Sequence, residues 1–184
     1  MIIPSPVNGI KPKISPKAFI APNATIIGDV TIEKGANIWY GAVLRGDTCS
    51  IKIGRNTSIQ DNCVLHSEAG TECIIEDHVI VGHSAMIHGP CIVERCTLIG
   101  ISSIVLQGSK VGAGAIVAGG ATARNEIAAL TLVVGTPTKP KKNLPKSKIA
   151  DHEQAAIAYV KNAKKFLEGG QNHPDLEPFL DDSL

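Results

Sequence analysis

The chain has 184 residues, enough for one domain with a sizeable core. Its 18 Lys and Arg residues against 17 Asp and Glu residues give a net charge of +1, which removes the electrostatic argument for binding nucleic acid or an anionic membrane surface. Aromatic residues make up only 3%, so stacking on nucleic acid bases is not expected, whereas 43% hydrophobic residues are enough for most of the chain to fold.

The cysteines and the N-terminal residues bear on the cellular compartment. The five cysteines are an odd number without a C-x-x-C pair, at Cys49, Cys63, Cys73, Cys91 and Cys96. Because disulfide frameworks are typical of smaller secreted chains, we expect reduced, partly buried thiols. No basic segment precedes an apolar run at the N-terminus, and no stretch is long enough to cross a bilayer. We therefore expect a cytoplasmic protein.

Large aliphatic residues recur every six positions from Ile14 to Val117, and the phase shifts by three residues after Leu44 and by four after Leu65. A small residue follows most of them four positions later. A period of six fits neither an amphipathic helix nor an alternating strand, but it fits a triangular solenoid with three faces and about 18 residues in each coil. An Ile- and Val-rich β-sandwich with accidental spacing is the alternative, and the 17 matching positions disfavour it. The spacing does not set the hand of the coil.

The repeat fades after Val117 into a segment rich in Pro and Lys. Residues from about 148 to 168 have helical spacing, and Gly169 and Gly170 end the predicted helix. The acidic residues 171–184 are expected to be loose. We therefore predict a mainly β protein, with a hexapeptide-repeat β-helix in residues 1–140. Residues 141–184 are predicted to form a linker, a C-terminal α-helix that packs on the solenoid, and an acidic tail.

Three of the six histidines, His66, His83 and His88, fall within 23 residues of this solenoid. His66 and His88 each follow an inward aliphatic residue, and their separation of 22 residues becomes one coil of 18 when the four-residue shift is subtracted. They should therefore stack on neighbouring strands, about 4.8 Å apart, where two imidazoles can share a metal. His83 lies on the preceding face and points to a different side of the prism. Isolated surface histidines usually bind nothing, but this arrangement favours a metal site between subunits, with two ligands from one chain and one from its neighbour.

Other polar residues fall in the same columns. Arg45 should stack with His66 and His88, while Asp61 lies beside His83 and Gln60 points outward on that face. Arg45 and Asp61 would then meet across the interface as a charge-assisted pair. Alternatively, Asp61 orients the imidazole of His83.

The strings IWYGAVLRGD (38–47), IQDNCVLH (59–66) and GHSAMIHG (82–89), carried on hexads, resemble the γ-class carbonic anhydrase family. That family includes ferripyochelin-binding-like, carnitine-operon and phenylacetate-pathway proteins. The resemblance covers about residues 10–140 and the C-terminal helix. It implies a left-handed parallel β-helix and a homotrimer, with zinc (or iron or cobalt) held between subunits by His66, His83 and His88.

The resemblance also implies roles for further residues. Arg45, Asp47, Gln60 and Asp61 correspond to interface and active-site residues, and Gln60 matches a glutamine that hydrogen-bonds solvent on the metal. Glu68, in the short loop SEAGTE, corresponds approximately to a proton-shuttle glutamate, and Tyr159 to a tyrosine that short relatives present to the site. The chain departs from active relatives at Thr48, where many carry an acid, and at Ser58, where asparagine is common.

Reversible hydration of CO2 to bicarbonate is therefore the leading functional hypothesis, with Glu68, Tyr159 or solvent exporting the proton. One alternative is hydrolysis of a coenzyme A thioester at the same metal site. Another is a non-catalytic metal-binding scaffold. A third is a hexapeptide acyltransferase, which uses one histidine as general base without a metal and leaves the stacked pair unexplained. One superfold hosts several chemistries, so the fold cannot separate these four.

Overall fold

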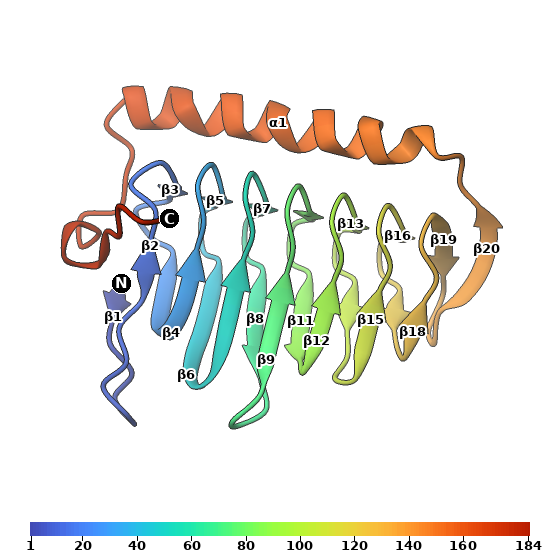
Figure 1. Ribbon diagram of the computed structural model, residues 1–184, viewed down its shortest axis with the longest axis horizontal. Helices are drawn as coiled ribbons and strands as arrows, with labels where there is room; N and C mark the ends of the chain where they lie inside the picture. The colour runs from blue at the N-terminus through green and yellow to red at the C-terminus, as the bar shows by residue number, and fades with distance from the viewer.

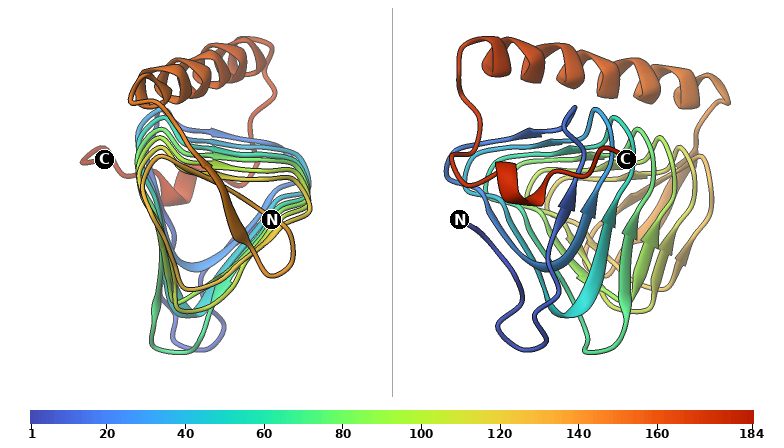
Figure 2. Two further views of the ribbon diagram at one scale, coloured as in Figure 1. Left: turned by 90° about the vertical axis from the view of Figure 1, so that its right-hand side faces the viewer. Right: turned by 60° about the vertical axis from the view of Figure 1, so that its left-hand side comes forward.

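A computed structural model describes all of residues 1–184. The chain winds into a left-handed parallel β-helix of triangular cross-section, and one long helix runs along it (Figures 1 and 2). Neighbouring strands are parallel throughout, except in the last hairpin, which joins β19 (Thr131–Val134) to β20 (Lys139–Asn143). This confirms the predicted fold class, and the resemblance indicated the hand correctly.

The prism has three flat faces, and the long strands β4 (Thr25–Ile32) and β6 (Val43–Ile53) bend round one corner to belong to two of them. The β8 face contains the first halves of β4 and β6 with β1 (Ile2–Ile3), β8 (Val64–Ser67), β11 (Met86–Gly89), β14 (Ile104–Val105) and β17 (Thr122–Ala123). The β9 face contains their second halves with β2 (Lys13–Ile14), β9 (Glu72–Ile75), β12 (Cys91–Val93), β15 (Ser109–Val111) and β18 (Glu126–Ile127). The β10 face contains β3 (Phe19–Ile20), β5 (Asn37–Ile38), β7 (Ser58–Ile59), β10 (Ile80–Val81), β13 (Leu98–Ile99), β16 (Ile116–Val117), β19 and β20.

The predicted hexad positions form the core of the prism. All 17 aliphatic side chains are at most 1% exposed, and they are Ile14, Ile20, Ile26, Ile32, Ile38, Leu44, Ile53, Ile59, Leu65, Ile75, Val81, Ile87, Val93, Ile99, Val105, Val111 and Val117. Each burial removes apolar area from water, and stacking in register lets every coil cover the next. The five cysteines are also buried and unpaired, as predicted.

The sequence pattern of large aliphatic residues fades after Val117, but the β-helix continues beyond it, within the predicted range of residues 1–140. The coil continues through β17, β18 and β19, where Ala123, Ile127 and Val133 point inward and are at most 5% exposed. Ala123 keeps the six-residue step from Val117, but it is small, and the next steps are four and six residues. The pattern of large aliphatic residues therefore could not reveal this last coil.

The helix α1 (Ser147–Glu168) lies along the β10 face, as Figure 1 shows, and confirms the helix predicted from about residue 148 to 168. Its Phe166 packs against Trp39 and Phe19, with ring centroids 5.2 Å and 5.8 Å apart, respectively. These aromatic side chains cover the apolar edge of the first coils. No helix of the protein is long and apolar enough to span a membrane.

The expectation of a loose C-terminal tail was wrong. After α1 the chain returns to the first coils, where His173 and Leu176 are 4% and 6% exposed and the short helix η1 (Glu177–Phe179) follows. Leu180 forms a parallel bridge with Ile14, and the amide of Asp181 donates to the Ile14 carbonyl over 2.8 Å. The tail packs because the exposed edge of the first coil offers it unpaired backbone groups and apolar surface.

Candidate metal centre

The stacked pair predicted from the register is present. His66 on β8 lies directly opposite His88 on β11, and both side chains stand on the outer surface of the β8 face. Their ring centroids are 5.7 Å apart with planes inclined by 80°. Neighbouring coils thus present two imidazoles side by side, as predicted from their separation of one full turn of the coil.

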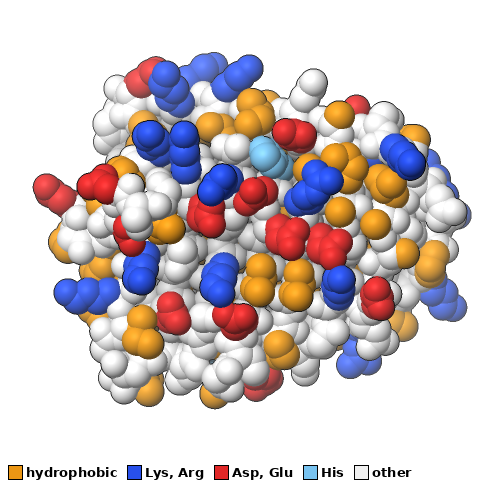
Figure 3. Space-filling view, in the orientation of Figure 1, with side chains coloured by type: hydrophobic (Ala, Val, Ile, Leu, Met, Phe, Trp, Pro, Cys, Tyr) orange, Lys and Arg blue, Asp and Glu red, His pale blue; other side chains and the backbone are white.

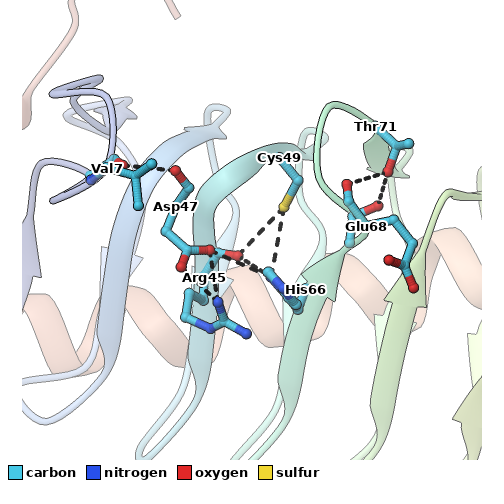
Figure 4. A network of polar contacts seen from close by, with 9 residues as sticks. Val7, Arg45, Asp47, Cys49, His66, Glu68 and Thr71 are labelled. Atoms are coloured by element: carbon cyan, nitrogen blue, oxygen red, sulfur yellow. Dashed lines mark hydrogen bonds and ion pairs between the residues drawn. The ribbon is translucent and has the colours of Figure 1, made fainter.

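The backbone of the preceding coil orients His66. Its Nδ1 lies 2.6 Å from the carbonyl oxygen of Arg45, so Nδ1 carries the proton and donates it, which leaves Nε2 with a free lone pair. The Cys49 thiol and the Asp47 carboxylate approach the same Nδ1 at 3.7 Å and 3.8 Å (Figure 4). All three groups therefore surround the side of the ring opposite Nε2.

Arg45 and Asp47 form an ion pair within one chain. The Arg45 Nη1 donates to both carboxylate oxygens of Asp47, at 2.8 Å and 2.7 Å. Burial raises the pKa of Asp47, but the hydrogen bonds and charge of Arg45 more than offset this, and the net pKa is lowered. The buried Ser5 hydroxyl donates to the Asp47 carbonyl over 2.7 Å, which ties the N-terminal segment to this turn.

The third histidine lies at the corner between the β10 and β8 faces. His83 Nδ1 is 2.8 Å from the Asp61 carboxylate, which confirms the prediction that these residues are neighbours on adjacent coils and corresponds to the orienting role proposed for Asp61. The backbone amide of His83 donates to Oε1 of the buried Gln60 over 3.2 Å. Asp61 thus has a partner within its own chain, as does Arg45.

The structure places the two predicted proton carriers differently. A Glu68 carboxylate oxygen lies 4.0 Å from His88 Nδ1, so Glu68 stands beside the stacked pair. Tyr159 is on α1 and packs against Trp39, with ring centroids 6.5 Å apart, so a single chain does not bring it to the pair. Nor does any group of three or more His, Cys, Asp or Glu side chains that could hold a metal come together within one chain.

The sequence reasoning missed two residues of this network, Cys49 and Ser5. Cys49 falls in the three-residue phase shift after Leu44, and the structure shows that these extra residues extend β6 past the corner and return the chain beside His66. The phase shift was the available signal. Ser5 precedes the first hexad, and nothing in its spacing marks it.

Comparison with known proteins agrees with this architecture. Residues 11–46 match the family model described as bacterial transferase hexapeptide (six repeats). A carbonic anhydrase from Geobacillus kaustophilus is 37% identical over 163 residues, covering 88% of this chain and 89% of the relative. The mitochondrial gamma carbonic anhydrase 1 of Arabidopsis thaliana is 39% identical over 156 residues. The chain belongs to the γ-class carbonic anhydrase family.

Membership of the γ-class carbonic anhydrase family does not by itself fix the activity of this chain. The match covers 80% of this chain but only 56% of the Arabidopsis relative. The solved structure of a hexapeptide transferase family protein from Anaplasma phagocytophilum superposes with a TM-score of 0.81 at 34% identity, covering 86% of this chain and 95% of that one. Proteins named carbonic anhydrases and a protein named as a hexapeptide transferase thus both resemble this chain, so the activity follows from the site rather than from the fold.

The residues present fit the metal that the family implies. Neutral imidazole nitrogens are common zinc ligands, and they also suit iron and cobalt. His66 and His83 each turn Nδ1 toward an acceptor, which is the usual arrangement of a histidine that binds a metal through its other nitrogen.

Proposed function

We propose that this protein is an enzyme that reversibly hydrates CO2 to bicarbonate at zinc sites shared between the subunits of a homotrimer. The observation that carries the proposal is the pair His66 and His88 on the β8 face, together with His83, which Asp61 holds at the corner between the β10 and β8 faces. When bound, zinc (or iron or cobalt) supplies a Lewis acid that makes water a nucleophile near neutral pH. Relatives named carbonic anhydrases support the same reaction.

The surface around the stacked pair supports the trimer. An outward row of apolar side chains runs up the β8 face beside the histidines, with Met86 42% exposed and Val43, Val64 and Ile104 partly exposed. A contiguous apolar row is typical of a surface that another chain covers. Because His83 lies on a different surface from the pair, the contact joins unlike patches, and identical contacts of that kind can close into a ring.

Each supporting residue has a role that follows from its contacts. The Arg45 carbonyl and the Asp61 carboxylate keep the proton on Nδ1 of His66 and His83, so that Nε2 is free to bind metal. The buried side chain of Gln60 accepts from the His83 amide, which leaves its NH2 group to donate to solvent or substrate at this corner. Arg45 and Asp47 would line the interface.

Glu68 and Tyr159 are the proposed proton carriers, together with solvent. Glu68 lies beside the pair in its own chain. Tyr159 packs on Trp39, and Trp39 belongs to the same corner as His83, two coils away. Tyr159 would therefore approach a neighbour's pair together with His83.

A stopped-flow assay of CO2 hydration on zinc-loaded protein tests the proposal, with His88→Ala as the control that lacks one ligand. We expect activity that is slow in weak buffer and faster in concentrated imidazole, because Glu68 is imperfectly placed and Thr48 offers no acid. No CO2 hydration by a zinc-loaded trimer at any buffer concentration would contradict the proposal.

The same preparation distinguishes the alternatives. Release of thiol from acetyl-coenzyme A, dependent on zinc, would favour the thioester hydrolase. Acyl transfer that persists after chelation would favour the acyltransferase, to which the name of the Anaplasma phagocytophilum protein points. Metal binding with no activity would leave a scaffold. The five unpaired cysteines support a reducing compartment such as the cytoplasm.

A further inference from the structure

The three histidines differ in one respect. Nδ1 of His66 and Nδ1 of His83 each have an acceptor, at 2.6 Å and 2.8 Å. Nδ1 of His88 is buried and has none, and it is the one buried side-chain nitrogen or oxygen of the whole chain without a hydrogen-bond partner. A buried polar atom left unpaired costs about 1–3 kcal/mol, so native proteins seldom leave one without a reason.

The nearest ionised acceptor to this atom is Glu68. Its Oε1 is 4.0 Å from His88 Nδ1, beyond hydrogen-bond distance, and its side chain is 59% exposed and free to turn. A hydrogen bond requires about 2.7–3.2 Å, so the carboxylate has to approach by about 1 Å. Rotation of one exposed side chain supplies a movement of that size without rebuilding the fold.

The loop that carries Glu68 is anchored at the right place. The Glu68 amide donates to the carbonyl of Gly89, the residue after His88, over 3.4 Å. On the other side of the loop, the Thr71 hydroxyl donates to the Glu68 carbonyl over 2.6 Å and lies 2.7 Å from the Ser67 hydroxyl (Figure 4). The backbone amide and carbonyl of Glu68 are therefore both fixed next to the coil of His88, although its exposed carboxylate can turn.

The space-filling view of Figure 3 shows the charged side chains of both signs that are spread over the visible face of the molecule.

We propose that Glu68 is a positioning residue for His88: its carboxylate accepts a hydrogen bond from Nδ1–H of His88, which keeps the proton on Nδ1 and directs the unprotonated Nε2 outward. This rests on the proposed function, because an outward Nε2 matters only if it binds the metal. All three histidines would then be held alike, by the Arg45 carbonyl, by Asp61 and by Glu68. A carboxylate on the far nitrogen also makes the imidazole a better donor to a metal.

This role differs from that of a proton carrier, and two substitutions separate them. Glu68→Gln keeps an oxygen that can accept from Nδ1 but cannot carry a proton, whereas Glu68→Ala removes both functions. Glu72→Ala is a matched control at the end of the same loop, where the Glu72 carboxylate pairs with Lys52 and does not contact a histidine. Because Glu68 and Glu72 are both exposed, all three variants should fold.

Zinc affinity, measured by competition with a chromogenic chelator, is the first readout. We expect Glu68→Ala to weaken zinc binding by about 10- to 100-fold, the range found when the partner of a ligating histidine is removed. Glu68→Gln should stay close to the wild-type protein, and Glu72→Ala should match it. An unchanged affinity in Glu68→Ala, or equal losses in both Glu68 variants, would overturn the proposal.

The tautomer of His88 is the second readout, and it needs no metal. Long-range ¹H–¹⁵N spectra of the metal-free protein at neutral pH should show His88 protonated at Nδ1, and Glu68→Ala should shift it toward a mixture of tautomers. The same tautomer in both proteins would overturn the positioning role. If the wild-type protein binds no zinc, the proposed function fails, while these spectra still decide whether Glu68 holds His88.

Discussion

Substitution of Gly28 by alanine tests how the corner beside the candidate metal centre is built. Gly28 lies in β4 with φ +76°, and β4 pairs with β6 so that Gly28 stands opposite Gly46. A Cβ added at Gly28 would overlap the carbonyl oxygen of Gly46 and lie 2.8 Å from its carbonyl carbon. Because the obstacle is backbone rather than a flexible side chain, neighbouring coils would have to separate.

The expected cost has two parts. A Cβ at positive φ costs about 1–2 kcal/mol, and overpacking against a fixed neighbour costs about 1–3 kcal/mol, so Gly28→Ala should lower the free energy of unfolding by about 2–5 kcal/mol. Gly120→Ala is the matched control, because Gly120 has φ +68° with no atom within 4 Å of an added Cβ. It should cost about 1–2 kcal/mol, from the first part alone.

Urea unfolding, followed by circular dichroism at one protein concentration, measures both values. Equal losses in Gly28→Ala and Gly120→Ala would refute the close approach of β4 and β6 at this corner. The approach matters for the site because Gly46 follows Arg45, whose carbonyl accepts from His66. Gly28→Ala should therefore also weaken zinc binding, whereas Gly120→Ala should not.

Three further outcomes are expected from the contacts of single side chains. Asp61→Ala should weaken zinc binding by about 10- to 100-fold. Because the Asp61 side chain is 36% exposed, the free energy of unfolding should change by less than about 1 kcal/mol. A larger loss of stability without loss of zinc would contradict the orienting role of Asp61. Burial raises the pKa of Cys63 to about 11, so iodoacetamide should label it in urea but not in the folded protein near neutral pH, as mass spectrometry would show. Burial lowers the pKa of His173, and repulsion from the Met1 ammonium adds to this while Asp175 opposes it. The unfolded chain therefore takes up a proton on His173 at a higher pH than the folded chain does, and the free energy of unfolding should fall as the pH drops below about 6.5. The fall should be less steep in His173→Gln, and equal slopes of stability against pH in the two proteins would contradict this.

The core and the stacked histidines could be predicted because the coil repeats with an integer period. Each inward position from Ile14 to Val117 follows from counting sixes and noting two shifts, and the same count places His66 beside His88. Only large aliphatic residues show this pattern clearly, which is why the pattern fades at Ala123 although the coil itself continues.

The remaining contacts depend on segments outside the repeat. The docking of Leu176 and Leu180 on the first coil joins residues more than 150 positions apart, and no local period encodes it. The placement of Cys49 against His66 depends on how the three-residue shift folds, and that of Glu68 on the four-residue shift. Counting in steps of six reveals that residues are inserted at the two phase shifts, but it does not predict where the inserted side chains lie.

Complementation between two inactive variants tests the shared metal site most directly. His66→Ala and His83→Ala should each lose activity and most of the zinc as homotrimers. When the two are unfolded together, mixed in equal amounts and refolded, a chain with intact His66 and His88 meets a neighbour with intact His83 at about a quarter of the sites, if assembly is random around a closed ring. The refolded mixture as a whole should therefore regain about that fraction of zinc and of CO2 hydration, all of it in mixed trimers, where about one site in three is complete. Mixed trimers that form but recover neither would contradict the shared site, because ligands drawn from a single chain can never be completed by mixing.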